Sequence, residues 1–203
     1  TTANVTVYPA YPSSSYSVTV TNDLGCTAVP TATITAKQKP TVNVSGSSVI
    51  CVGTTTTLSS STVGTWTSSN SSVAIVNNAG VVTGIAAGTA TFTFTNSISG
   101  CTSDATAPVT VYDKPVIFYT GPTAICIGSQ TSLSPSVGGT WTSSNTAIAT
   151  VTNAGAVTGI APGTATFTFT SSSTGCISNP SGTLTVDDKE GVAISGPTSI
   201  CIA

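Results

Sequence analysis

The sequence repeats itself with a period of 75 residues. The segment Gly-Thr-Trp-Thr-Ser-Ser-Asn occurs at 64–70 and again at 139–145, so that Trp66 and Trp141 are 75 residues apart. Two further blocks recur at this offset, Val82–Ala86 at Val157–Ala161 and Gly88–Thr95 at Gly163–Thr170. A unit of this length can enclose its own hydrophobic core, unlike the shorter helical or leucine-rich repeats. The chain is therefore expected to be a tandem series of small domains.

The limits of the units follow from residues that recur at their edges. The glycines Gly46, Gly121 and Gly196 each precede a cysteine by five residues, and Lys-Pro or Lys-Glu pairs follow each unit, at residues 39–40, 114–115 and 189–190. Proline and exposed charge suit linkers. We therefore expect the C-terminal half of a preceding module at 1–38, complete repeats at 39–113 and 114–188, and the first strands of a further repeat at 189–203.

Within a unit the apolar residues alternate with polar ones, as in half-buried strands. Ala90, Phe92 and Phe94 alternate with threonines, and helical periodicity is nowhere sustained. Glycine, serine and asparagine separate the predicted strands, which in the first repeat are Thr41–Val44, Val49–Val52, Thr55–Ser59, Thr65–Ser68, Val73–Val76, Val81–Thr83, Thr89–Thr95 and Ala107–Val111. So many short strands in one unit predict an all-β fold of tandem Greek-key β-sandwiches.

A tight hairpin turn is predicted at Asn78-Ala79-Gly80 and at Asn153-Ala154-Gly155, because asparagine and glycine tolerate positive φ. The core of each unit is predicted around its tryptophan. The proposed core anchors are Trp66, Phe92 and Phe94 in the first repeat and Trp141, Phe167 and Phe169 in the second. An exposed tryptophan that stacks on a sugar is the alternative interpretation of Trp66 and Trp141.

Charge and residue types argue against several classes of function. The chain has four lysines and no arginine, and its net charge is −2, so it lacks the basic patch that nucleic acid binding requires. Serine, threonine and glycine interrupt every apolar stretch, so no membrane span is expected. No histidine is present to act as a general base, and no phosphate-binding glycine loop occurs. We expect neither an enzyme nor a bound cofactor.

Metal binding is also not expected. Zinc is disfavoured because the chain has no histidine and no Cys-x-x-Cys pair. Calcium at the joins is the alternative, with Asp113, Asp187, Asp188 and Glu190 as possible ligands. One or two carboxylates at each join fall short of the six to eight oxygens that calcium prefers, which favours solvated linker charge.

The blocks quoted above, together with Cys-Val-Gly-Thr-Thr-Thr-Thr-Leu at 51–58 and Val-Ala-Ile-Val at 73–76, resemble the bacterial immunoglobulin-like domain of group 2. The resemblance spans most of residues 39–188 and implies tandem immunoglobulin-like sandwiches arranged head to tail, similar to modules of intimin- and invasin-type adhesins. The segments at 121–128 and 16–26 further resemble repeats of very large Bacteroidota surface proteins, including gliding-motility adhesins exported by the type 9 route. Residues 1–38 depart from the group 2 pattern.

Six cysteines fall into two series with the 75-residue period. Cys51, Cys126 and Cys201 precede the second strand of a unit, and Cys26, Cys101 and Cys176 lie near its last hairpin. For an exported protein disulfides are expected. Spacing favours bonds within a module, Cys51–Cys101 and Cys126–Cys176. Sandwich topology places the two series at opposite ends, roughly 20 Å apart, whereas a disulfide spans about 7 Å at most.

A cross-module bond from Cys51 to Cys176 is therefore predicted, with the other cysteines left for neighbouring repeats, and free thiols are the third alternative. For the function we expect the shaft or stalk of an extracellular adhesin or filament. Its partners would be neighbouring repeats, a surface glycan or protein bound at a distant tip, and other copies in a homopolymer or bundle. The alternative is a module that binds glycan or protein through its own loops.

Overall fold

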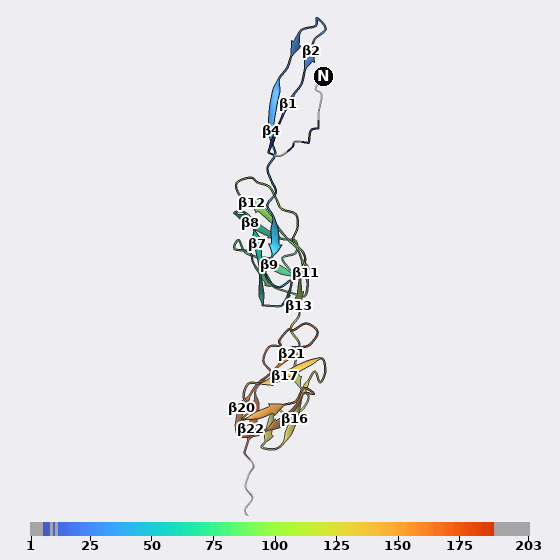
Figure 1. Ribbon diagram of the computed structural model, residues 1–203. Coiled ribbons are helices and arrows are strands. Elements are labelled where there is room, and N and C mark those ends of the chain that lie inside the picture. Colours follow the sequence, from blue (N-terminus) through green and yellow to red (C-terminus); the bar gives the residue numbers. More distant parts are fainter. Residues whose placement is uncertain (1–5, 9, 11, 189–203) are drawn as a thin grey trace, which may run out of the picture. The chain divides into compact units, whose positions relative to one another are not determined.

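The structure is a computed structural model that describes residues 6–8, 10 and 12–188. Within this part of the chain all regular secondary structure is β-strand. The chain forms two compact units, which divide between Tyr112 and Asp113 (Figure 1). The expected further copy at 189–203, with Cys201, lies outside the described residues.

The first layer of repeat 1 is an antiparallel sheet of four strands in the order β5-β7-β10-β9. The strands are β5 (Val42–Val44), β7 (Thr55–Ser60), β10 (Val81–Gly84) and β9 (Ala74–Val76). Along β7 the burial alternates, with Thr56 and Leu58 inside and their neighbours exposed or half-buried. This alternation places one face of the sheet against the core.

The second layer contains β11 (Gly88–Ala90), β13 (Val109–Tyr112) and β6 (Val49–Cys51), and beside them β12 (Phe92–Asn96) with β8 (Gly64–Ser68). The pair β13 and β6 is parallel, whereas β5, just before β6 in the chain, pairs with β7 in the first layer. The chain therefore changes layer between β5 and β6. A single cluster of buried residues from both layers forms the core, so repeat 1 is an immunoglobulin-like sandwich.

Repeat 2 has the same topology. Its first sheet is β14 (Phe118–Tyr119), β16 (Gln130–Ser134), β19 (Ala156–Gly159) and β18 (Ala149–Val151). The opposite layer is β15 (Ala124–Cys126), β22 (Leu184–Asp187) and β20 (Gly163–Ala165), with the pair β17 (Gly139–Ser143) and β21 (Phe167–Ser171). A second cluster of buried residues forms the core of repeat 2. The fold class expected from the sequence, all-β with immunoglobulin-like sandwiches in tandem, is confirmed.

One predicted strand is wrong. The alternating segment 89–95 is divided at Thr91 into β11, which pairs with β13, and β12, which pairs with β8. At the break the Thr91 N–H donates to Ser69 Oγ and its carbonyl accepts from the Ser69 N–H. Alternation persists through the break because both halves face the same core, so the sequence pattern shows no interruption.

The N-terminal residues form a hairpin. In it β1 (Ser13–Ser17) pairs with β4 (Thr31–Thr35), and β2 (Val20–Thr21) pairs with β3 (Thr27–Ala28). The tip closes at Gly25, with φ of 80°, and Asn22 Oδ1 accepts hydrogen bonds from the N–H groups of Leu24 and Cys26. That this hairpin is the last part of a preceding module stays a prediction.

The predicted tight turns are present, but a different residue closes the first one. Gly80 has φ of 79°, and its N–H donates to the carbonyl of Asn77. The Asn77 side chain, and not Asn78, accepts from the N–H groups of Ala79 and Val81. In the second turn Gly155 has positive φ. No asparagine of either turn has a positive φ.

Both tryptophans lie in the cores. Trp66 is 8% exposed and Trp141 is 6% exposed. Trp66 lies directly opposite Phe94 in the β8–β12 ladder, and their rings meet edge to face at 5.0 Å between centroids. In repeat 2 Trp141 and Phe169 meet at 5.1 Å. An indole buried to this extent offers no ring face for stacking on a sugar.

The glycine two residues before each tryptophan makes room for the contact between the indole and the phenyl ring. A Cβ on Gly64 would meet the Thr95 carbonyl and the Phe94 ring, and one on Gly139 would meet the Thr170 carbonyl and the Phe169 ring. The Gly-Thr-Trp block that recurs in both repeats is therefore one packing unit. Its glycine lets β8 approach β12 closely in repeat 1 and lets β17 approach β21 closely in repeat 2.

Replacing Trp66 by alanine is expected to unfold repeat 1 or to lower its free energy of unfolding by about 3–5 kcal/mol, because a buried indole is removed from a small core. Urea unfolding of the full chain, followed by hydrogen exchange at the Phe92 and Phe94 amides, measures this. The Trp141 indole N–H signal is the internal control for repeat 2. A melting temperature within a few degrees of wild type would contradict the core assignment.

Replacing Gly139 by alanine is expected to destabilise repeat 2 by about 1–3 kcal/mol through overpacking. Gly182 is the matched control, because a Cβ there meets no heavy atom within 4 Å. Gly182→Ala should shift the stability by less than about 0.5 kcal/mol. Urea titration read from the Trp141 indole signal compares the two variants, and equal effects would refute the close-packing role.

Candidate functional site

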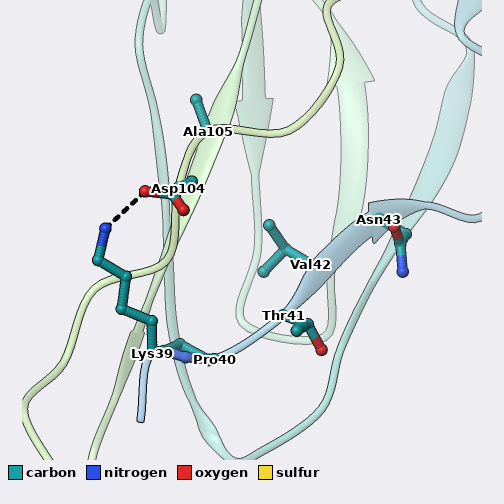
Figure 2. A pocket seen from close by; sticks show the side chains of 7 residues that line it. All are labelled: Lys39, Pro40, Thr41, Val42, Asn43, Asp104 and Ala105. Atoms are coloured by element: carbon teal, nitrogen blue, oxygen red, sulfur yellow. Dashed lines mark hydrogen bonds and ion pairs between the residues drawn. The ribbon is translucent and has the colours of Figure 1, made fainter. Parts of the chain in front are cut away.

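The N-terminal end of repeat 1 carries a surface hollow of about 340 Å³ (Figure 2). Lys39 and Asp104 close one side with an ion pair of 2.6 Å between Nζ and Oδ1, and Pro40, Val42 and Ala105 line the rest. Both charged side chains face solvent, at 63% and 86% exposure. Such a pair contributes little to stability, but it holds the incoming chain against the segment after Cys101.

Repeat 2 has a hollow at the same place, of about 220 Å³, lined by Lys114, Pro115, Val116, Ile117, Asn179 and Pro180. Asn179 takes the position of Asp104, and its Oδ1 accepts a hydrogen bond of 3.3 Å from Lys114 Nζ. The lysine contact is therefore retained although the charge of its partner is not. A ligand site that needs the carboxylate would exist in one repeat only, which favours a structural role for both contacts.

Tyr119 strengthens this end of repeat 2. Its hydroxyl donates to the Gly182 carbonyl at 3.1 Å and lies 3.4 Å from Ser181 Oγ. Burial raises the pKa of the Tyr119 phenol, and the hydrogen bond with Ser181 partly opposes this. Repeat 1 has Val44 at the equivalent position, so the phenol is a local addition.

The second series of cysteines lies at this same N-terminal end. Cys101 Sγ is 3.7 Å from the Lys37 carbonyl, and Lys37 Nζ donates to the Ser99 carbonyl at 3.2 Å. In repeat 2 Cys176 is fully buried, three residues before Asn179. Lys37, in the linker before repeat 1, thus lies directly beside Ser99 and Cys101.

The first series lies at the opposite, C-terminal end of each repeat. Cys51 is the register partner of Tyr112, the last residue of β13, and Cys126 is that of Asp187 in β22. Thr54 fixes the turn after Cys51, since its N–H and hydroxyl both donate to the Cys51 carbonyl at 2.9 Å. The two series therefore occupy opposite ends of a module, as the predicted topology required.

The oxidation states separate the alternatives. Cys51 and Cys176 are disulfide-bonded, whereas Cys26, Cys101 and Cys126 are thiols. Because Cys101 and Cys126 are thiols, neither within-module bond, Cys51–Cys101 or Cys126–Cys176, is formed. The pairing of Cys51 with Cys176 stays a prediction.

Sequence reasoning missed four hydroxyl residues, two in each repeat, that complete the cores. In repeat 1, Ser103 Oγ accepts a hydrogen bond from the Phe94 N–H, and Thr106 Oγ1 accepts one from the Phe92 N–H. In repeat 2, Ser178 Oγ and Ser181 Oγ accept the equivalent bonds from the N–H groups of Phe169 and Phe167. The residues of repeat 1 are about 6% exposed. Only their recurrence at the 75-residue offset signalled them, in a chain where serine and threonine recur everywhere.

The described residues contain no group of three or more cysteine or carboxylate side chains that could hold a metal ion. Of the proposed calcium ligands, Glu190 lies outside the described residues. No helix long and apolar enough to cross a membrane occurs within residues 12–188.

The bacterial Ig-like domain (group 2) family model matches residues 28–106 and 130–176. No curated protein matches the sequence significantly. A crystal structure of the S-layer protein rSbsC(31-844) matches 89% of this chain and 36% of its own, at 19% identity and a TM-score of 0.30. Invasin, a bacterial integrin-binding protein, matches 84% and 44%, at 17% identity and 0.44.

The Yersinia pseudotuberculosis adhesin InvE matches 73% of this chain and 58% of its own, at 14% identity and a TM-score of 0.26. The chain thus spans about a third of the S-layer protein's length, and identities this low give no information about function. The family model, in contrast, covers more than half of the chain and includes the Gly-Thr-Trp block of both repeats. The chain belongs to the bacterial Ig-like domain (group 2) family.

Proposed function

We propose that this chain is a spacer, one stretch of the shaft of an exported bacterial surface adhesin or filament. The observation that carries the proposal is the repetition of one closed core. Repeat 1 and repeat 2 bury equivalent residues, Trp66 and Trp141 among them, each within its own cluster. A series of self-contained domains adds length without requiring any new contact.

The surface chemistry agrees with a spacer. Charged residues make up 5% of the chain, and the contacts repeated at both N-terminal ends hold the linker lysine to its own module. Two disulfide-bonded cysteines suit an oxidising, extracellular location. The chain has no histidine to supply an acid or base, and the proposed role is not enzymatic.

The narrower assignment, to a Bacteroidota protein exported by the type 9 route and related to gliding-motility adhesins, is part of the proposal. It is supported by the Gly-Pro-Thr-x-Ile-Cys motif at 121–126 and the strand leading to Cys26, which resemble repeats of such proteins. Glycan or protein recognition would then belong to a distant tip, and neighbouring repeats would be the partners of these modules.

A shaft segment is expected to show no saturable binding on a glycan array, because its described hollows are shallow and poorly matched between repeats. The full 203-residue chain is tested beside a known glycan-binding domain carrying the same tag. Saturable binding to one glycan class would instead support the rival function, recognition through the loops.

The hollow beside Trp66, lined also by Ser68, Ser71 and Ile75, is the place to examine if binding is found. Ser71→Tyr would place a large ring in it from an exposed position. Loss of binding in this variant would locate the site there, and unchanged binding would point to the module ends.

A further inference from the structure

We propose that Cys51 and Cys176 are bonded to each other and that this bond carries tension past both cores. The proposal rests on the shaft role for its biological use, since a shaft is pulled along its length. Its evidence is separate, however, and comes from the positions and oxidation states of the cysteines.

The first step is the location of the two series within a module. Cys51 lies opposite Tyr112, the residue at which the chain leaves repeat 1. Cys101 lies beside Lys37, where the chain arrives at repeat 1, and Cys176 is its equivalent in repeat 2. Chain continuity joins the C-terminal end of repeat 1 to the N-terminal end of repeat 2. A first-series cysteine is therefore matched with the second-series cysteine of the following repeat.

The second step is the pattern of oxidation. Cys51 and Cys176 are 125 residues apart and are both disulfide-bonded, and the other three described cysteines are thiols. A bond between Cys51 and Cys176 joins the two bonded cysteines and involves none of the three thiols.

Formation of the bond is a two-electron oxidation. The Cys51 and Cys176 thiols each lose a proton and one electron as the S–S bond forms, and the disulfide of a thiol–disulfide oxidoreductase or of oxidised glutathione is reduced to two thiols. No other group of the chain is required.

The mechanical consequence follows from the loop that the bond closes. When the ends of the chain are pulled, tension enters at Cys51, crosses the S–S bond and continues from Cys176, so residues 52–175 bear none of it. This loop contains Trp66 and Trp141 and nearly all of both cores. Of the strands that contribute to the two cores, β5, β6 and β22 are the ones that remain under load.

The bond therefore makes the shaft almost inextensible. Without it each repeat releases about 75 residues on unfolding, or about 25–27 nm at 3.3–3.6 Å per residue. With it only residues 39–50 and 177–188 can be drawn out, which is less than about 9 nm for both repeats together. A domain series without such bonds lengthens stepwise under load.

Peptide mapping tests the connectivity. The full chain is refolded with oxidised and reduced glutathione and digested, without reduction, by chymotrypsin and a lysine-specific protease. Cleavage after Lys37, Trp66, Tyr112, Trp141 and Lys189 places every cysteine on a different peptide. The expected product joins the Cys51 and Cys176 peptides. A Cys51–Cys101 or Cys126–Cys176 product would overturn the proposal.

Single-molecule pulling tests the shielding. The full chain is held by tags at its two ends, so that no cysteine is used for attachment. We expect no step longer than about 9 nm in oxidised protein and two steps of about 25–27 nm after reduction. Two long steps in oxidised protein with the mapped bond intact would show that the bond does not shield the cores.

Matched variants separate the bond from general effects of cysteine. The double variant Cys51→Ser with Cys176→Ser should show both long steps without reductant. Cys101→Ser with Cys126→Ser should behave as wild type, and loss of shielding in this control would overturn the proposal. Glycan binding by a shielded chain would refute the pure spacer while leaving the shielding intact, so the two proposals fail separately.

Discussion

The edge-to-face contact between an indole and a phenyl ring determines how each repeat is packed. Trp66 and Phe94 are direct partners across β8 and β12, so their contact fixes the register of that pair. The register in turn brings Gly64 against Thr95, where a side chain would not fit. Phe92, on the same strand, then points to the remaining core. The same geometry recurs around Trp141, which is why this block is the best preserved part of the repeat.

The sequence was sufficient for the fold because the period of 75 and the alternation of apolar residues are strong signals. It could not show that 89–95 changes sheets at Thr91, because burial continues on one face while only the hydrogen-bond partners change. Nor could it choose Asn77 over Asn78 at the turn, since either asparagine can accept from the backbone. The strand limits otherwise differ by one or two residues.

The residues that could not be identified from the sequence are those that accept hydrogen bonds from buried backbone N–H groups. β12 pairs with β8 on one side only, and a buried N–H without a partner is costly. Ser103 and Thr106 provide the missing acceptors from the segment after Cys101. The segment after Cys101 is thereby tied to β12, a strand of the core. Cysteine connectivity was likewise open, because spacing alone favoured bonds that the thiol states of Cys101 and Cys126 exclude.

A chain with so few charges must limit edge-to-edge pairing by other means. Exposed sheet edges recruit further strands, and many proteins protect them with lysine. In the four-stranded sheets the edge strands are short: β5 and β9 have three residues each, and β14 has two. Three residues offer few free N–H and C=O groups to a neighbouring molecule, and Pro40 precedes β5 directly. Strand length thus limits pairing at the edges of these two sheets.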